Sequence, residues 1–119
     1  MIVAVVPDLF FAAKLQATAR ATGAGLVLVS PGEALERCAE AAPLRLLVDL
    51  HAAGALELVR ALKADPRTAR IPVVGFYSHV ETALRLEALA SGVDEALPRS
   101  AFVSRLAALL SDDAPHSTP

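Results

Sequence analysis

The chain has 119 residues, a formal net charge of −2 at pH 7, and 55% hydrophobic residues. A chain of this length folds as one domain and buries about two thirds of its unfolded surface, so it needs no disulfide or structural metal. The charge gives no reason to expect nucleic acid or a membrane surface as a partner. Aromatic residues make up only 4% of the chain, so a base-stacking surface is not expected either.

The compartment follows from two further observations. No apolar run approaches the roughly 20 residues needed to cross a bilayer, and the apolar segment from Met1 to Val6 has no basic residues before it, unlike a signal peptide. Cys38 is the single cysteine, which excludes an internal disulfide and fits a reducing compartment. We therefore expect a cytoplasmic protein, with Cys38 as a half-buried helix residue.

The first half of the chain predicts two strands, each followed by a helix. The apolar run over 2–6 predicts a strand, and Pro7-Asp8 ends it before a helical pattern over 9–21 that stops at Gly23. A second strand is expected over 26–29. Ser30 followed by Pro31 is typical of a helix N-terminus, and this helix should end near residue 42, before Pro43.

The second half continues the alternation three more times. We expect strands over 44–49, 72–77 and 94–97, and helices over 54–64, 80–90 and 101–110. Residues 111–119 are Ser, Asp, Pro, His, Thr and Ala and have almost nothing to bury, so they are expected to form a disordered tail after a domain of residues 1–110.

Apolar strands that alternate with helices indicate an α/β fold with a parallel sheet covered on both faces. Right-handed crossovers favour a doubly wound, five-stranded sheet in the order 2-1-3-4-5, which is a flavodoxin-like three-layer sandwich. In this order the first and third strands are neighbours. Asp8 and Asp49 follow those two strands, so we expect both carboxylates at the same edge of the sheet, where ligands bind in such folds.

Three segments resemble the receiver domain of bacterial response regulators, the family of the chemotaxis regulator. Leu46 to Asp49 resembles the strand that carries the phosphorylated aspartate, Leu62 to Val74 resembles the link into the fourth strand, and Ala88 to Leu97 is similar to the family's "ALxxGADDYL" stretch. The resemblance covers about residues 1–110. It implies a two-component (phosphorelay) signalling role with Asp49 as the phospho-acceptor.

The positions that match the family's active site depart from its pattern. The family holds magnesium with two adjacent acids, which here are Pro7 and Asp8. The family's switch threonine or serine falls at Tyr77, with Ser78 directly after it, and its lysine falls at Arg99. The resemblance therefore implies that Tyr77, Ser78 and Arg99 occupy switch positions, with altered chemistry.

These departures have physical consequences. Phosphorylation of a carboxylate needs charge neutralisation, which Mg²⁺ usually supplies from an oxygen-ligand site. Asp8 and Asp49 offer two such ligands but Pro7 offers none, so we expect no cofactor or only weak Mg²⁺ binding. Arg99 is a planar, permanently charged group: it either pairs with Asp8 or Asp49 or points to solvent. Tyr77 either covers the acceptor or caps the sheet end, and Ser78 replaces the hydroxyl only if the strand register shifts.

Two other groups of residues suggest a different kind of site. His51 and His79 lie just past strand ends near Asp8 and Asp49, and this set suggests a transition-metal or small-ligand module as an alternative. The pattern from Asp49 through His51 to Gly54 matches that of cobalamin-binding domains, but it follows the wrong strand and is attributed to chance. No nucleophile–base–acid set is present in the sequence pattern, so an enzyme is not expected.

The function that the sequence favours is a stand-alone, degenerate receiver, or pseudo-receiver, that docks a protein partner such as a histidine kinase or a downstream effector. The face formed by residues 80–110 is the expected docking surface, and a homodimer is an alternative use of it. A working response regulator phosphorylated on Asp49 with Mg²⁺ is the alternative function. The candidate polar contacts on this face are Arg85, Glu87, Asp94, Glu95 and Arg105.

Overall fold

The structure is a computed structural model, and it describes residues 1–78 and 82–111. A five-stranded parallel sheet in the order β2-β1-β3-β4-β5 forms its centre, which confirms the predicted fold. Residues 112–119 of the tail expected over 111–119, and residues 80–81 of the helix expected at 80–90, lie outside the described residues. The elements are β1 (Ile2–Val5), α1 (Leu9–Thr22), β2 (Leu26–Leu28), α2 (Pro31–Ala41), β3 (Arg45–Asp49), α3 (Ala55–Ala64), β4 (Val73–Tyr77), α4 (Thr82–Ser91), β5 (Glu95–Pro98), α5 (Arg99–Ser104) and α6 (Leu106–Leu109).

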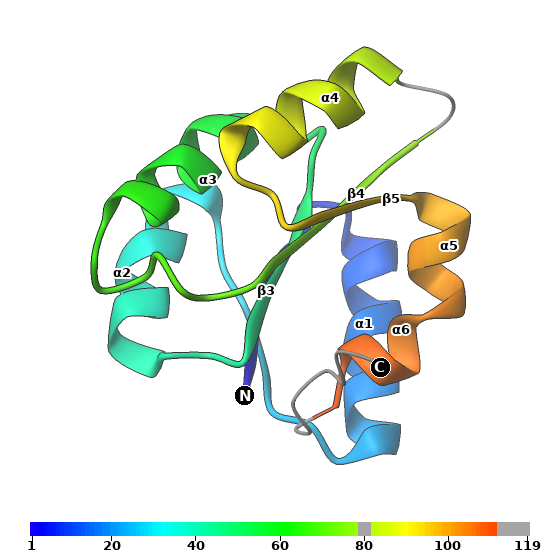
Figure 1. Ribbon diagram of the computed structural model, residues 1–119. Coiled ribbons are helices and arrows are strands. Elements are labelled where there is room, and N and C mark those ends of the chain that lie inside the picture. Colours follow the sequence, from blue (N-terminus) through cyan, green and yellow to red (C-terminus); the bar gives the residue numbers. More distant parts are fainter. Residues whose placement is uncertain (79–81, 112–119) are drawn as a thin grey trace, which may run out of the picture.

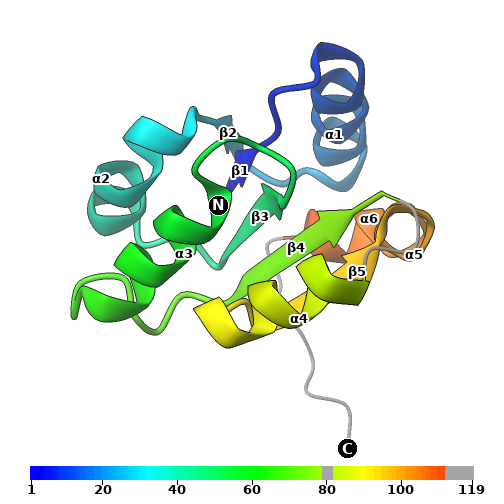
Figure 2. The same cartoon turned by 90° about the horizontal axis from the view of Figure 1, so that it is seen from above.

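The sheet is the middle of three layers. Helices α2, α3 and α4 cover one face, and α1, α5 and α6 cover the other (Figures 1 and 2). Because successive side chains of a strand point to opposite faces, each strand contributes to two cores. In β3, Leu46 and Val48 pack toward the α2–α3–α4 layer while Leu47 packs toward the other layer. This explains why the central strands are apolar at nearly every position.

The helix starts follow the chemistry that the sequence indicated. Ser30 precedes α2, and both its N–H and its hydroxyl donate to Glu33 Oε1, at 3.2 and 2.9 Å. These hydrogen bonds lower the pKa of Glu33. At the end of α1, Gly23 adopts the left-handed conformation (φ 79°), which a glycine reaches without steric cost.

The prediction of a single last helix over 101–110 is wrong. The chain forms two short helices, α5 and α6, and Arg105 between them has φ −100° and ψ 4°. The Ser104 hydroxyl donates to the Ala101 carbonyl, a local bond that competes with regular helix. The Arg105 guanidinium forms an ion pair with Glu95 on β5. The residue at the break thus contacts a strand ten residues earlier in the chain, which helical periodicity does not report.

Arg45 is a buried cation that the sequence analysis did not single out. It begins β3, and only 1% of its surface is exposed. Its Nη1 donates to the carbonyl oxygens of Leu109 and Ser111, at 2.7 and 2.8 Å. Thr22 at the end of α1 also donates, to the Leu110 carbonyl. The end of α6 is thus held from the sheet on one side and from α1 on the other.

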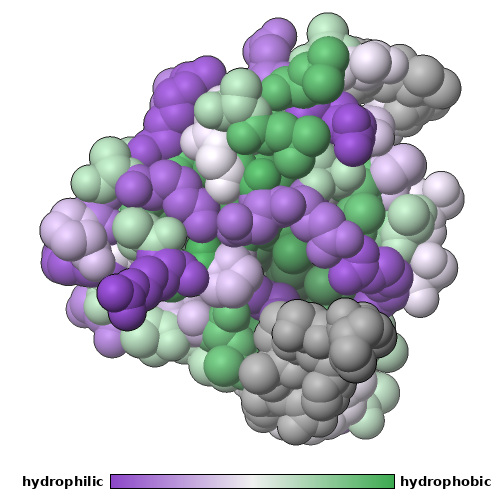
Figure 3. Space-filling model, in the orientation of Figure 1, coloured by the Kyte–Doolittle hydropathy of each residue, from purple (hydrophilic) through white to green (hydrophobic). Residues whose placement is uncertain are grey.

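Large apolar side chains are exposed at Met1, at the start of α1 and on α4. Leu9 and Phe10 at the start of α1 are 83% and 91% exposed, and Leu86 and Leu89 on α4 are 57% and 37% exposed. In Figure 3, hydrophobic residues appear on the surface along α4, at the top of the view. No helix among residues 1–78 and 82–111 is long and apolar enough to cross a membrane.

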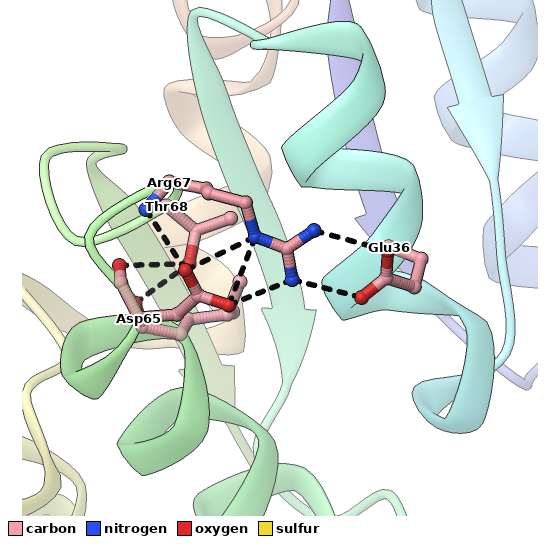
Figure 4. Close-up of polar contacts among 5 residues, drawn as sticks. Glu36, Asp65, Arg67 and Thr68 are labelled. Carbon is pink, nitrogen blue, oxygen red and sulfur yellow. Dashed lines mark hydrogen bonds and ion pairs between the residues drawn. The ribbon is translucent and has the colours of Figure 1, made fainter.

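An ion-pair network joins α2 to the loop after α3 (Figure 4). The Arg67 guanidinium donates to both carboxylate oxygens of Glu36, at 3.2 and 2.9 Å, and to Asp65 Oδ2 at 2.8 Å. Hydrogen bonds from the Arg67 side chain are the main cause that lowers the pKa values of Asp65 and Glu36. Beneath the network, the buried Thr68 hydroxyl donates to the Leu62 carbonyl at 2.7 Å and fixes the same turn.

The Arg67 network predicts a pH-dependent contribution to stability. A carboxyl whose pKa is lower in the folded chain stabilises the fold above its unfolded pKa, and this contribution disappears as pH falls through the folded value. We expect Arg67→Met to lower the unfolding free energy at pH 7 and to lose this effect below about pH 4. Urea denaturation at several pH values measures it, with Arg70→Met at an exposed position as the control. A pH-independent difference would contradict the ion-pair origin.

Gly75 in β4 makes room for Leu50, the residue that follows Asp49. A Cβ built on Gly75 would lie 2.6 Å from Leu50 Cδ2 and 2.8 Å from its Cγ. Leu50 is itself buried, with 4% of its surface exposed, so it has little space into which to move. The small residue in β4 therefore permits the close packing of the chain segment that leaves β3.

We expect Gly75→Ala to lower the unfolding free energy by about 1–3 kcal/mol through overpacking. Combining it with Leu50→Ala removes the clashing atoms, so the double variant should lose less than the sum of the two single losses. Urea denaturation of the wild type and the three variants measures both terms. Additive losses would show that Leu50 does not limit the space at Gly75.

Candidate functional site

The predicted site residues lie at the edge of the sheet where the strands end. In the β1–β3 pair Val5 lies opposite Val48, so Asp8, three residues after β1, and Asp49, the last residue of β3, both lie at this edge. In the next pairs Asp49 lies opposite Phe76, and Tyr77 lies opposite Pro98, which Arg99 follows. The topology therefore brings the loops that carry the predicted site residues to one side of the molecule.

Asp8 is the N-cap of α1. Its Oδ1 accepts hydrogen bonds from the N–H groups of Phe10 and Phe11, at 2.9 and 3.1 Å. Its Oδ2 lies 3.9 Å from Arg99 Nη2, and both side chains are about half exposed. The carboxylate thus satisfies two of the free N–H groups that every helix start presents, while its other oxygen faces a cation.

Arg99 is the first residue of α5, and its half-exposed side chain lies over an aromatic ring. Its guanidinium carbon lies 4.1 Å from the ring centroid of Phe11, a cation–π contact. Phe11 in turn packs against Phe76 and Phe102, with ring centroids 5.1 and 6.0 Å apart. Of the two interpretations open from the sequence, the geometry agrees with an arginine that faces Asp8, and the aromatic cluster fixes its position.

Asp49 is partly buried and is joined to the loop after β4 through His51. Asp49 Oδ1 accepts the N–H of His51 at 2.9 Å, as in an Asx-turn. The imidazole of His51 then accepts the backbone N–H of Ser78 at Nε2, also at 2.9 Å. This contact between two loops was missed from the sequence, where His51 suggested only a solvated residue or a metal ligand.

Tyr77, Ser78 and Cys38 have distinct surroundings. Tyr77 is buried in the core between the sheet and the α2–α3–α4 layer. Ser78 is partly buried, and its backbone N–H makes the contact with His51.

Cys38 is fully buried, not half-buried as expected, because α2 packs it against the sheet. Burial raises the pKa of the Cys38 thiol to about 11, so it is not a reactive thiol at neutral pH.

The described residues do not form a ready Mg²⁺ site. Mg²⁺ requires a near-octahedral shell of oxygen ligands, whereas Asp8 and Asp49 each commit one oxygen to backbone N–H groups. The second oxygen of Asp8 faces the Arg99 guanidinium, which competes with a metal cation. Across residues 1–78 and 82–111 no three His, Cys, Asp or Glu side chains are grouped to hold a metal. His79, the partner expected for His51, lies outside the described residues.

Comparison with solved structures identifies the fold. The receiver domain of NtrX from Brucella abortus matches with a TM-score of 0.80 at 18% identity, covering 99% of this chain and 100% of that one. A response regulator from Hahella chejuensis matches at 0.79 and 18%, covering 92% and 90%. The manganese-bound form of the response regulator Rcp1 matches at 0.68 and 18%, covering 92% and 87%. The chain therefore has the receiver fold of response regulators.

The comparisons by sequence add no family assignment. No protein-family model matches the chain, and no curated protein matches it. The likeness thus lies in the three-dimensional arrangement, at an identity that establishes the fold alone.

The two contacts of Asp8 predict different effects for two substitutions. Asp8→Ala removes the cap, so we expect it to lower the unfolding free energy by about 1 kcal/mol. Asp8→Asn keeps an acceptor oxygen for the cap and removes only the charge that faces Arg99, so its loss should be a few tenths of a kcal/mol. Thermal or urea denaturation at neutral pH compares them. An equal loss in both variants would show that the ion pair matters more than the cap.

Proposed function

We propose that this chain is a degenerate receiver domain of two-component signalling, which acts by docking a protein partner and takes up phosphoryl groups at Asp49 weakly or not at all. The observation that carries the proposal is the use of the Asp8 carboxylate. It caps α1 and faces Arg99 where an acidic pair would hold a metal, and Pro7 next to it has no ligand atom in its side chain.

Magnesium dependence separates this proposal from a working receiver. The solved structure of Rcp1, which has this fold, is a manganese-bound form, so a protein with this fold can bind a divalent cation. In this chain Asp49 and Asp8 would supply the ligands. Their existing hydrogen bonds and the cation at position 99 oppose binding, so we propose that Mg²⁺ binds weakly.

The docking surface proposed is the face of α4, β5 and α5. Leu86 and Leu89 are exposed and three residues apart, so they lie on the same side of α4. Charged side chains border them. Arg85 and Glu87 on α4 are exposed, whereas Glu95 and Arg105 pair with each other and Asp94 pairs with Lys63 at 2.9 Å. An apolar strip with a polar border is typical of a protein-binding surface.

The partner is proposed to be a signalling protein, either a histidine kinase or a downstream effector, with a second copy of the chain as the other candidate. An enzymatic role is not proposed. The alternative function is a working response regulator, which the position of Asp49 at the end of β3 also allows. The second alternative is a metal-binding module with His51 and His79, which thermal shift tests. No shift with Zn²⁺, Co²⁺ or Ni²⁺ is expected.

Incubation with acetyl phosphate and magnesium chloride, followed by intact-mass measurement, tests the proposal. We expect the wild type to gain the mass of one phosphoryl group in only a small fraction of molecules, because the charge on the incoming group is poorly neutralised. Asp49→Asn should gain none. Rapid, stoichiometric uptake that Asp49→Asn abolishes would establish the working response regulator instead.

A further inference from the structure

Two backbone N–H groups, in the loops that follow β3 and β4, already have acceptors. The N–H of His51 donates to Asp49 Oδ1, and the N–H of Ser78 donates to the His51 imidazole, each at 2.9 Å. A backbone N–H needs a lone pair, so Nε2 of His51 is the unprotonated ring nitrogen in this contact. His51 thus links the loop after β3 to the loop after β4.

The Ser78 N–H lies at the edge of the sheet where a phosphoryl group on Asp49 would need hydrogen-bond donors. Asp49 lies opposite Phe76 in the β3–β4 pair, and Ser78 follows two residues after Phe76. Backbone N–H groups at strand and loop ends are good donors to anionic oxygens. A phosphoryl group on Asp49 would bring such oxygens to the edge where the Ser78 N–H lies. The imidazole nitrogen of His51 holds that donor instead.

We propose that His51 is an internal competitor for the Ser78 N–H and restrains phosphoryl transfer to Asp49. This inference rests on the proposed receiver function and names one cause of weak uptake. In the step, a carboxylate oxygen of Asp49 bonds to the phosphorus of acetyl phosphate, and the bond from phosphorus to the acetate oxygen breaks. Acetate leaves with that electron pair. The freed Ser78 N–H then donates to a phosphoryl oxygen.

The surroundings of His51 allow its side chain to leave. His51 is an exposed loop residue, and it is absent from both core clusters. Within residues 1–78 and 82–111, the ionisable groups that the topology brings to this edge include Asp49 on β3, Asp8 before α1, Arg99 on α5 and the buried Tyr77 on β4. The restraint is one neutral hydrogen bond, so its removal should accelerate uptake by about 2- to 10-fold.

The experiment compares the initial rate of phosphoryl uptake from acetyl phosphate in the full chain and its variants by intact mass. His51→Ala removes the acceptor and should be about 2- to 10-fold faster than the wild type. His51→Gln keeps an acceptor oxygen and should fall between the two. Arg60→Ala, at an exposed position on α3, should match the wild type. Equal or slower uptake by His51→Ala, no uptake in either chain, or equal rates for His51→Gln and His51→Ala would overturn the inference.

A second measurement tests the contact without phosphorylation. In ¹⁵N-labelled protein, a scalar coupling through the hydrogen bond should join the Ser78 amide nitrogen to His51 Nε2, and it should vanish in His51→Ala. Its absence from the wild type would overturn the inference. The two proposals are tested by different results. Fast uptake by the wild type contradicts the proposal of a degenerate receiver. The ratio of the His51→Ala rate to the wild-type rate tests the restraint by His51.

Discussion

The Asp8 carboxylate is the group on which the functional interpretation depends. Three residues separate β1 from α1, and the last of them, Asp8, satisfies free N–H groups at the helix start with its Oδ1. Arg99 approaches from α5 on the other side. A carboxylate that is already paired in this way loses part of its capacity to bind a cation. This strand end therefore carries a structural contact between the start of α1 and the start of α5.

The sheet could be predicted because its determinants are local or topological. The apolar strands, Ser30 before α2 and Gly23 after α1 are all readable along the chain, and right-handed crossovers then leave few strand orders. The split of the last helix could not be predicted from periodicity, and the residue at the split, Arg105, pairs with Glu95 on β5. Periodicity reports which face of a helix is buried and says nothing about such a partner.

The candidate site could likewise be predicted only in part. Topology alone places Asp8 and Asp49 at one edge, but the atoms that these carboxylates contact depend on loop conformation. The imidazole of His51 accepts a hydrogen bond from an N–H group 27 residues later in the chain, and no sequence spacing predicts that contact. The position of Cys38 in an alanine-rich helix predicts half burial, whereas the packing of α2 on the sheet covers Cys38 fully.

The buried guanidinium of Arg45 has a consequence for where the folded unit ends. Arginine stays charged at any ordinary pH, so its carbonyl acceptors at Leu109 and Ser111 are needed whenever the strand is in place. A version of the chain cut before Leu109 would leave a cation inside the protein without these two acceptors. The last turn is thus a counterpart to the third strand rather than a dispensable end, and any fusion partner is best attached after Ser111.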